Sequence, residues 1–141
     1  MIYDHGFIAA HFFALIGWFA LFALPKVGLK RGLLWARLSG GLLCFAYVVM
    51  LIANWSALPH GEGFNLTSVA AAFAMPGLAL TFWIHYLAFD LWVGAWEAED
   101  AAERGVPHAV LVPCLIATFM IGPLGLLLYL ALRRLGARPT Q

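Results

Sequence analysis

An imidazole and a carboxylate stand inside a long apolar and aromatic stretch, WIHYLAFDLWVGAW, which covers residues 83–96. The imidazole belongs to His85 and the carboxylate to Asp90. Such a pair in an apolar pocket can transfer protons to or from a bound molecule. A second imidazole, that of His108, opens the next apolar stretch. We therefore take Asp90, His85 and His108 as the candidate catalytic residues.

The position of Asp90 within an apolar segment is energetically unfavourable and needs an explanation. An aspartate at the centre of a membrane helix costs about 2.5 to 3.5 kcal/mol, and such residues usually face the protein interior or a functional cavity. A partner such as His108, or protonation, would lower that cost. His85 is five residues from Asp90, about 140° around a helix, so each needs a partner on another helix or they line two walls of one cavity. A structural hydrogen bond to Tyr86 or to the backbone is the alternative for Asp90.

Aromatic residues accompany both polar groups. Trp83 and Tyr86 share a helix face with Asp90, whereas Phe89 and Trp92 share another with His85. We expect Tyr86 to orient the polar end of a ligand and the other rings to line its apolar body, with an interfacial tryptophan belt as the alternative. Two polar residues near the opposite membrane face complete the set, although structural hydrogen bonds between helices are their alternative. The candidate ligand-binding residues are Trp83, Tyr86, Phe89, Trp92, His11 and Asn54.

The composition indicates an integral membrane protein. Hydrophobic residues make up 64% of the 141 residues and charged residues 11%, against roughly 25% charged in a soluble domain. The mean hydropathy is +0.90. The length favours a single membrane domain over residues 1–141. A net charge of +1 predicts no nucleic-acid partner.

Four apolar runs are long enough to cross a bilayer, which takes about 20 residues. They cover residues 7–24, 38–58, 68–96 and 109–132. We predict an all-α fold with four transmembrane helices in a compact bundle. The third run is too long for a straight crossing and should tilt, protrude or bend at Pro76. Alternatively, residues 68–75 form a short interfacial segment.

The distribution of basic residues predicts an orientation. The loop 25–37 contains Lys26, Lys30, Arg31 and Arg37, whereas the next loop has no lysine or arginine. The loop 25–37 is therefore predicted to be cytoplasmic, in a bacterial-type inner membrane. Four spans would place the C-terminal segment RRLGARPTQ, with three arginines, on the other side, against the charge rule. We expect the third helix to continue into water through an acidic segment, EAEDAAER, that is capped by Gly105.

Several other chemistries lack their motifs. The sequence has no closely spaced histidine pairs of the di-iron type, no glycine-rich dinucleotide loop and no nucleophilic serine elbow. No metal site is predicted. A haem or metal held by histidines of different spans, for example His11 and His85, stays open as the weakest alternative.

Three segments carry a family resemblance: HYLAFDLWVGAWEAED, then GVPH at residues 105–108, then VPCLIATFMIGPLGLLLYLALR. With Asp, Pro-His, Pro-Cys and Gly-Pro in this order, they resemble the small membrane protein family named for the abscisic-acid-deficient-four protein of plants, which is associated with neoxanthin formation from violaxanthin. The similarity is clear over residues 83–133. In the earlier part, the number and placement of the spans are compatible with it.

The resemblance implies an isomerisation of an epoxycarotenoid to an allenic alcohol. This reaction needs an acid for the epoxide oxygen and a base for a proton of the polyene, and it consumes no cofactor. We therefore expect a membrane isomerase for a carotenoid, retinoid or related isoprenoid, with Asp90 as proton donor or acceptor and His85 or His108 as its counterpart. The rival of another class is a non-catalytic carotenoid- or lipid-binding protein or an accessory subunit of a carotenoid enzyme.

The expected partners follow from the same interpretation. They are a lipophilic small molecule and membrane lipid, together with a second copy of the chain or a carotenoid enzyme. A four-span bundle of 15.4 kDa has little room to enclose a long polyene, which favours a lipid-facing groove or a dimer seam. Small residues, such as Gly40, Gly122 and Gly125, permit tight helix contacts within one chain or between copies.

Overall fold

A computed structural model describes residues 2–58 and 65–136 of the chain. In these residues it contains seven α-helices, one short 3-10 turn at Trp55–Ala57 and no strand, so the all-α prediction is confirmed. The helices are α1 (Ile2–Phe22), α2 (Leu24–Val27), α3 (Leu29–Ala53), α4 (Leu66–Phe73), α5 (Pro76–Arg104), α6 (His108–Met120) and α7 (Gly122–Gly136).

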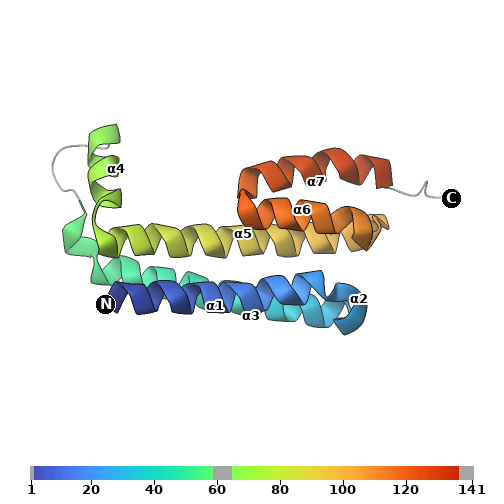
Figure 1. Ribbon diagram of the computed structural model, residues 1–141, viewed down its shortest axis with the longest axis horizontal. Helices are drawn as coiled ribbons and strands as arrows, with labels where there is room; N and C mark the ends of the chain where they lie inside the picture. Colours follow the sequence, from blue (N-terminus) through green and yellow to red (C-terminus); the bar gives the residue numbers. More distant parts are fainter. Residues whose placement is uncertain (1, 59–64, 137–141) are drawn as a thin grey trace.

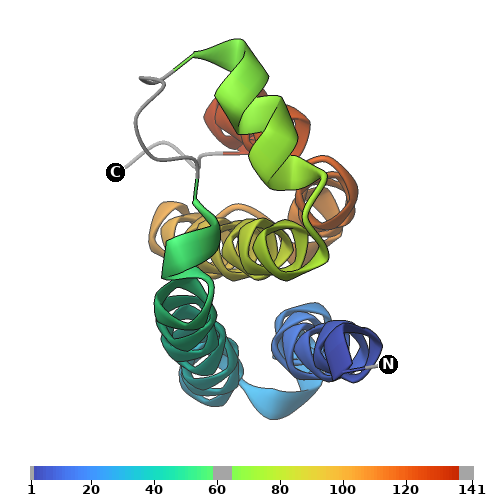
Figure 2. The ribbon, with the colours of Figure 1, turned by 90° about the vertical axis from the view of Figure 1, so that its left-hand side faces the viewer.

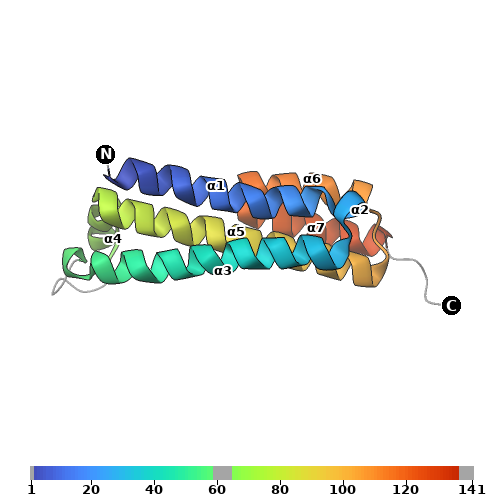
Figure 3. The same cartoon turned by 90° about the horizontal axis from the view of Figure 1, so that it is seen from below.

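The helix α5 lies at the centre of the molecule. The long helices α1 and α3 pack on one side of it, and α6 and α7 lie on the other (Figure 1, Figure 2). Seen from below, α1, α3 and α5 run side by side along the long axis (Figure 3). Among the described residues, three segments are long and apolar enough to cross a membrane: Tyr3–Phe22, Leu29–Ala53 and Pro76–Arg104.

The joints between the helices follow local sequence rules. Gly28, with φ of +84°, connects α2 to α3 in a backbone conformation that favours glycine. Asn65 and Ser68 form a reciprocal capping box at the start of α4. The predicted change of direction at Pro76 is confirmed, because α4 ends at Phe73 and α5 begins at Pro76. The part before Pro76 is a separate short helix that stands across α5, in line with the alternative we considered (Figure 1).

The fourth predicted span, residues 109–132, is not a single helix. The helix α6 ends at Met120, Ile121 leaves the helical conformation, and α7 starts at Gly122 and folds back along α6 (Figure 1). Pro123 explains the break, since proline lacks an N–H and its ring clashes with the carbonyl four residues earlier. Of the predicted four-span bundle, the described residues therefore form three long helices and a hairpin of two shorter ones.

The acidic end of α5 also differs from the prediction. Gly105 ends α5 in the left-handed conformation, as its cap role predicts. The last turns of α5, however, are covered by the α6–α7 hairpin, so that Glu97 is fully buried and Asp100 is 9% exposed. Only the outer side of this segment agrees with an acidic surface: Glu103 is exposed.

Candidate functional site

Asp90 lies at the middle of α5, fourteen residues from both Pro76 and Arg104. At the usual helical rise this is about 21 Å from either end. The residue is 8% exposed, and its Oδ2 atom has no hydrogen-bond partner. The turn of the hairpin covers it so closely that a Cβ added at Gly122 would collide with its carboxylate. Asp90 is therefore a buried carboxyl group with an unused acceptor atom.

Tyr86 lies one helical turn before Asp90 and faces the same hairpin turn. Its hydroxyl donates a long hydrogen bond, 3.4 Å, to the carbonyl oxygen of Met120. It also interacts with the carboxyl group of Asp90. Both side chains thus meet where α6 turns into α7. Their spacing of four residues correctly places them on the same face of α5.

An aromatic row leads from the N-terminal end of α1 to Tyr86. The ring centroids are 4.2 Å apart for Phe7 and His11, 5.6 Å for His11 and Trp83, and 5.4 Å for Trp83 and Tyr86. The indole N–H of Trp83 donates a hydrogen bond of 3.2 Å to Nε2 of His11. We call Phe7, His11, Trp83 and Tyr86 the aromatic row. Their rings form a continuous series of contacts that ends next to Asp90.

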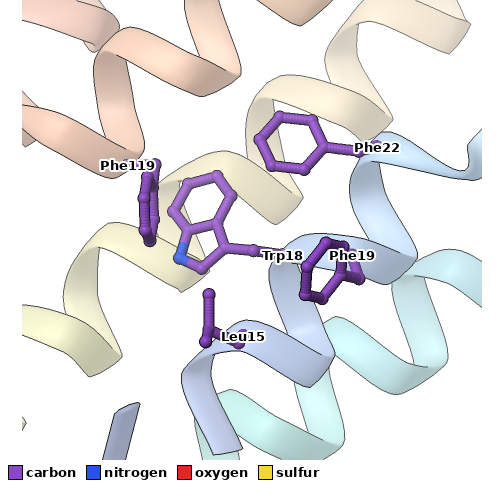
Figure 4. A pocket seen from close by; sticks show the side chains of 5 residues that line it. All are labelled: Leu15, Trp18, Phe19, Phe22 and Phe119. Carbon is purple, nitrogen blue, oxygen red and sulfur yellow. The ribbon is translucent and has the colours of Figure 1, made fainter. Parts of the chain in front are cut away.

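Two clefts lie along the same side of α1. One, of about 440 Å³, lies at the start of the aromatic row and is lined by Tyr3, Asp4, Phe7, Pro76, Ala79, Leu80 and Trp83. The other, of about 180 Å³, is wholly apolar and is lined by Leu15, Trp18, Phe19, Phe22 and Phe119 (Figure 4). The α1 residues 4, 7, 11, 15, 18 and 22 recur at spacings of three and four and so share one helix face. A long apolar ligand lying along this face would contact residues of both clefts.

Three predicted site residues lie on another face of α5. His85 is exposed and stacks on Phe89 at a centroid distance of 4.5 Å, and its other ring neighbour is Tyr47 of α3 at 5.2 Å. Trp92 packs with its indole nitrogen against Gly40 of α3. His85, Phe89 and Trp92, which we call the His85 face, are therefore separated from the face that holds Trp83, Tyr86 and Asp90, the Asp90 face.

His108 does not lie beside Asp90, and so it is not the partner that the sequence suggested for this carboxyl group. It is the first residue of α6, near the end of α5, and its Nε2 lies 3.2 Å from the carbonyl oxygen of Phe22 at the end of α1. The suggested pairing was wrong because α6 begins only after the end of α5 at Arg104, whereas Asp90 lies at the middle of α5. The contact of His108 ties α6 to α1 instead.

Asn54 lies at the other end of the molecule. Its side-chain amide donates a hydrogen bond of 2.8 Å to the carbonyl oxygen of Met50 and closes α3. Its carboxamide oxygen packs against Gly77, close to the hydroxyl of Tyr3, which lines the larger cleft. Asn54 is thus near the entrance of the aromatic row, with a local helix-ending role.

Two acids that the sequence analysis assigned to water are part of the interior. Both carboxylate oxygens of Glu97 accept hydrogen bonds from the hydroxyl of Thr118, at 2.9 and 3.1 Å. Asp100 accepts a bond of 2.6 Å from the hydroxyl of Tyr129 and pairs with Arg104 and Arg133. The signal was available, since Glu97 follows Asp90 by seven residues and so lies on the same helix face.

No group of three or more histidine, cysteine, aspartate or glutamate side chains could hold a metal ion within residues 2–58 and 65–136. For the haem alternative, the two histidines considered do not face each other. His11 contacts Trp83 on the Asp90 face, whereas His85 points toward Tyr47 on the other face. What the site offers is a buried carboxyl group, a phenol beside it and a row of stacked rings.

A family model described as ABA DEFICIENT 4-like matches residues 6–129 of the chain. This match confirms the resemblance that residues 83–133 carry and extends it over most of the chain. It includes the aromatic row, Asp90 and the turn of the hairpin. No curated protein and no solved structure matches the chain.

Proposed function

Since this chain belongs to the ABA DEFICIENT 4-like family, we propose that it binds a carotenoid or a related isoprenoid in a membrane and isomerises it by proton transfer. Family membership supports a role in carotenoid metabolism. The observation that supports proton transfer is the buried Asp90 carboxyl, whose Oδ2 has no partner, at the inner end of the aromatic row. A carboxyl group there meets an apolar ligand and little water.

The aromatic row and the carboxyl group have separate tasks in this proposal. A polyene stacks along Phe7, His11 and Trp83, whose π faces also stabilise a transient cation. Tyr86 orients the polar end of the ligand, and Asp90 exchanges protons with it. An isomerisation moves one proton onto the ligand and another off it, so no cofactor is consumed. The groups that exchange these protons must return to their starting state before the next turnover.

The decisive variant is Asp90→Asn, which keeps the size of the side chain and removes the exchangeable acid. The assay follows the isomer composition of added epoxycarotenoids, other carotenoids and retinoids by chromatography, using purified protein in lipid nanodiscs. Because general acid–base catalysis contributes about 10²- to 10⁴-fold, we expect turnover to fall at least about 100-fold with ligand binding retained. Glu99→Gln, a partly exposed acid of the same helix, is the matched control.

Each other outcome of this assay has a meaning. A polyene that binds the wild type without any change of isomer supports a carrier or an accessory subunit instead. Full activity of the Asp90→Asn variant removes Asp90 from the mechanism. A Soret band in the purified protein would identify a haem protein and overturn both the isomerase and the carrier or accessory-subunit proposals.

The basic residues support an orientation of the chain. Seven of its eight lysines and arginines lie in the described residues. They belong to α2, the first part of α3, the end of α5 and the end of α7, and the hairpin returns the end of α7 to the end of the molecule where α2 lies (Figure 1). They are Lys26, Lys30, Arg31, Arg37, Arg104, Arg133 and Arg134. The eighth, Arg138, lies outside the described residues. The conflict of the four-span prediction with the charge rule disappears when the last segment is a hairpin. We place this end, with the loop 25–37, in the cytoplasm of a bacterial-type inner membrane.

Labelling of single cysteines tests this orientation. In a background with Cys44→Ala and Cys114→Ala, the variants Leu66→Cys and Arg134→Cys are exposed to a membrane-impermeant maleimide on intact cells. Leu66 is 83% exposed at the start of α4, at the end away from α2. We expect labelling at position 66 alone, and at position 134 only after lysis. Labelling of both positions in intact cells means that residues 109–132 cross the membrane.

A further inference from the structure

We propose that Glu97 is a proton relay through which Asp90 exchanges protons with the water at the basic end of the molecule. The relay rests on the proposed function in one respect: Asp90 must bind and release a proton. It concerns the group that returns Asp90 to its starting state, and it does not depend on which polyene is bound.

The burial of Glu97 is the first observation. Its side chain is fully buried between α5 and α6, in a helix that is long and apolar enough to cross a membrane. The hydrogen-bond partner of its carboxylate is a neutral hydroxyl, that of Thr118. A buried carboxyl group with a neutral donor is expensive as a fixed ion and is suited to binding and releasing a proton.

Asp100 provides a contrast three residues further on. It lies at the same seam between α5 and the hairpin, but two guanidinium groups, of Arg104 and Arg133, and the hydroxyl of Tyr129 hold its carboxylate. These partners favour the ionised form. Asp100 is therefore the fixed charge at the water end of the seam, whereas among the described residues Glu97 pairs with no lysine or arginine.

Asp90, Glu97 and the end of α5 lie in this order along the seam and define a route for protons. Asp90 and Glu97 are seven residues apart on the same face of α5, about 10 Å along the helix, and Glu97 is seven residues from Arg104 at the end of the helix. The unpartnered Oδ2 of Asp90 is at the inner end of this seam. Glu97 thus lies midway between the buried acid and the basic end.

The groups that face Glu97 from the packed helices are mostly neutral. From α6 they are the hydroxyl of Thr118 and the buried thiol of Cys114. Within α5, the carboxyl group of Asp90 is close enough to interact with it electrostatically. The guanidinium groups lie beyond, at Asp100.

The transfer is a sequence of proton hops with no change of oxidation state. A proton from water at the basic end binds the Glu97 carboxylate and forms an O–H bond. That bond breaks when the proton passes to the Asp90 carboxylate, and the transfer over the intervening distance requires water molecules to enter the seam. Glu97 is left as a carboxylate and takes up the next proton, and the reverse sequence removes a proton from Asp90.

The test is Glu97→Gln, whose amide oxygen still accepts the hydrogen bond of Thr118 but carries no exchangeable acid. Infrared spectroscopy follows the Asp90 carboxyl after a rapid change of pH in protein without ligand, and the Asp90→Asn variant identifies its absorption. The carbonyl band of the acid reports the protonated form, and the carboxylate bands report the ionised form. We expect the response of Asp90 to slow by at least about tenfold, with an unchanged unfolding temperature. A purely structural role of Glu97 would not alter this rate.

Two further variants make the result decisive. Glu99→Gln changes a partly exposed acid that pairs with Arg37, and its Asp90 should respond at the wild-type rate. If Glu97→Gln does not fold, Thr118→Val removes the hydroxyl that holds Glu97 at similar volume, and it should also slow the response. An unaltered Asp90 response in the folded Glu97 variant, or in the Thr118 variant where that one is needed, overturns the relay.

The outcomes separate the relay from the proposed function. The infrared measurement contains no polyene, so a slowed response supports the relay even where no isomerisation is found. An inactive Asp90→Asn protein together with a Glu97→Gln protein that responds at the wild-type rate overturns the relay and leaves the isomerase proposal in place.

Discussion

The two faces of α5 differ in what covers them. The Asp90 face is packed against α1 and the α6–α7 hairpin and holds two deeply buried carboxyl groups, of Asp90 and Glu97. The His85 face meets α3, and its aromatic residues Phe89 and Trp92 are 58% and 42% exposed. Both faces carry rings, yet the carboxyl groups are buried only where helices from two sides enclose the helix.

This difference shows that the α6–α7 hairpin is needed to bury the carboxyl groups of α5. An acid in a membrane helix is tolerated where protein surrounds it, because lipid offers no hydrogen bonds. Gly122 brings the hairpin turn onto Asp90, and Thr118 donates to Glu97. An imidazole such as that of His85 can lie at the less covered face, since its neutral form carries no charge.

Gly122→Ala is expected to have the largest effect on this comparison. The added methyl group collides with the Asp90 carboxylate, so the turn must move away and open the covered face. Overpacking of this kind destabilises by about 1 to 3 kcal/mol. We expect a lower unfolding temperature and a loss of isomerase activity of at least about tenfold, smaller than the loss of about 100-fold expected for Asp90→Asn. Thermal unfolding in nanodiscs and the chromatographic assay measure both.

Gly41→Ala is the matched control, because a Cβ at this helical glycine meets no atom within 4 Å. It should not destabilise the protein, because alanine is favoured over glycine inside a helix by about 0.5 to 1 kcal/mol. Wild-type activity in both glycine variants would show that close covering of Asp90 is not needed.

A smaller effect should separate the aromatic residues of the two faces. Trp83→Leu removes the ring at the centre of the aromatic row, whereas Phe89→Leu removes a ring that stacks on His85. An aromatic contact is worth about 0.5 to 1.5 kcal/mol beyond its burial. We expect Trp83→Leu to weaken carotenoid binding by up to about tenfold and Phe89→Leu to leave it within about twofold. Both affinities are measured by titrating the protein with the polyene and following the absorbance of the polyene itself, which does not depend on the tryptophan that is changed.

The reverse ranking of these two variants would place the ligand on the His85 face. Equal weakening would instead indicate a ligand that wraps around α5. Either result would show that carotenoid binding is not confined to the Asp90 face.

Much of the fold follows from local sequence. Apolar length identifies the three long helices, Gly105 ends α5, and Pro76 starts it. The hairpin was missed because residues 109–132 are apolar throughout, and hydropathy does not distinguish a straight span from two short helices. The Gly122–Pro123 pair was the signal, since proline interrupts a helix there in the same way as at Pro76.

The candidate site was predictable to a similar degree. Spacing correctly groups Trp83 and Tyr86 with Asp90 and separates them from His85. The depth of Asp90 was not predictable while the span was taken to end at Trp96. Glu97 was overlooked because neighbouring charges suggested water, and only the packing of the hairpin on α5 places it inside. The catalytic and binding roles of these residues remain predictions.

The short hairpin has a consequence for kinetics. The thirteen residues of α6 reach about 20 Å, less than the roughly 30 Å of a hydrocarbon core, and so the hairpin stops near the middle of α5. Beyond that point, the next described helix on the hairpin side of α5 is α4 (Figure 1). A polyene already dissolved among the acyl chains would diffuse sideways to Asp90 without entering water. The reaction rate would then follow the mole fraction of polyene in the lipid, and diluting it with more lipid at constant total concentration would slow the reaction.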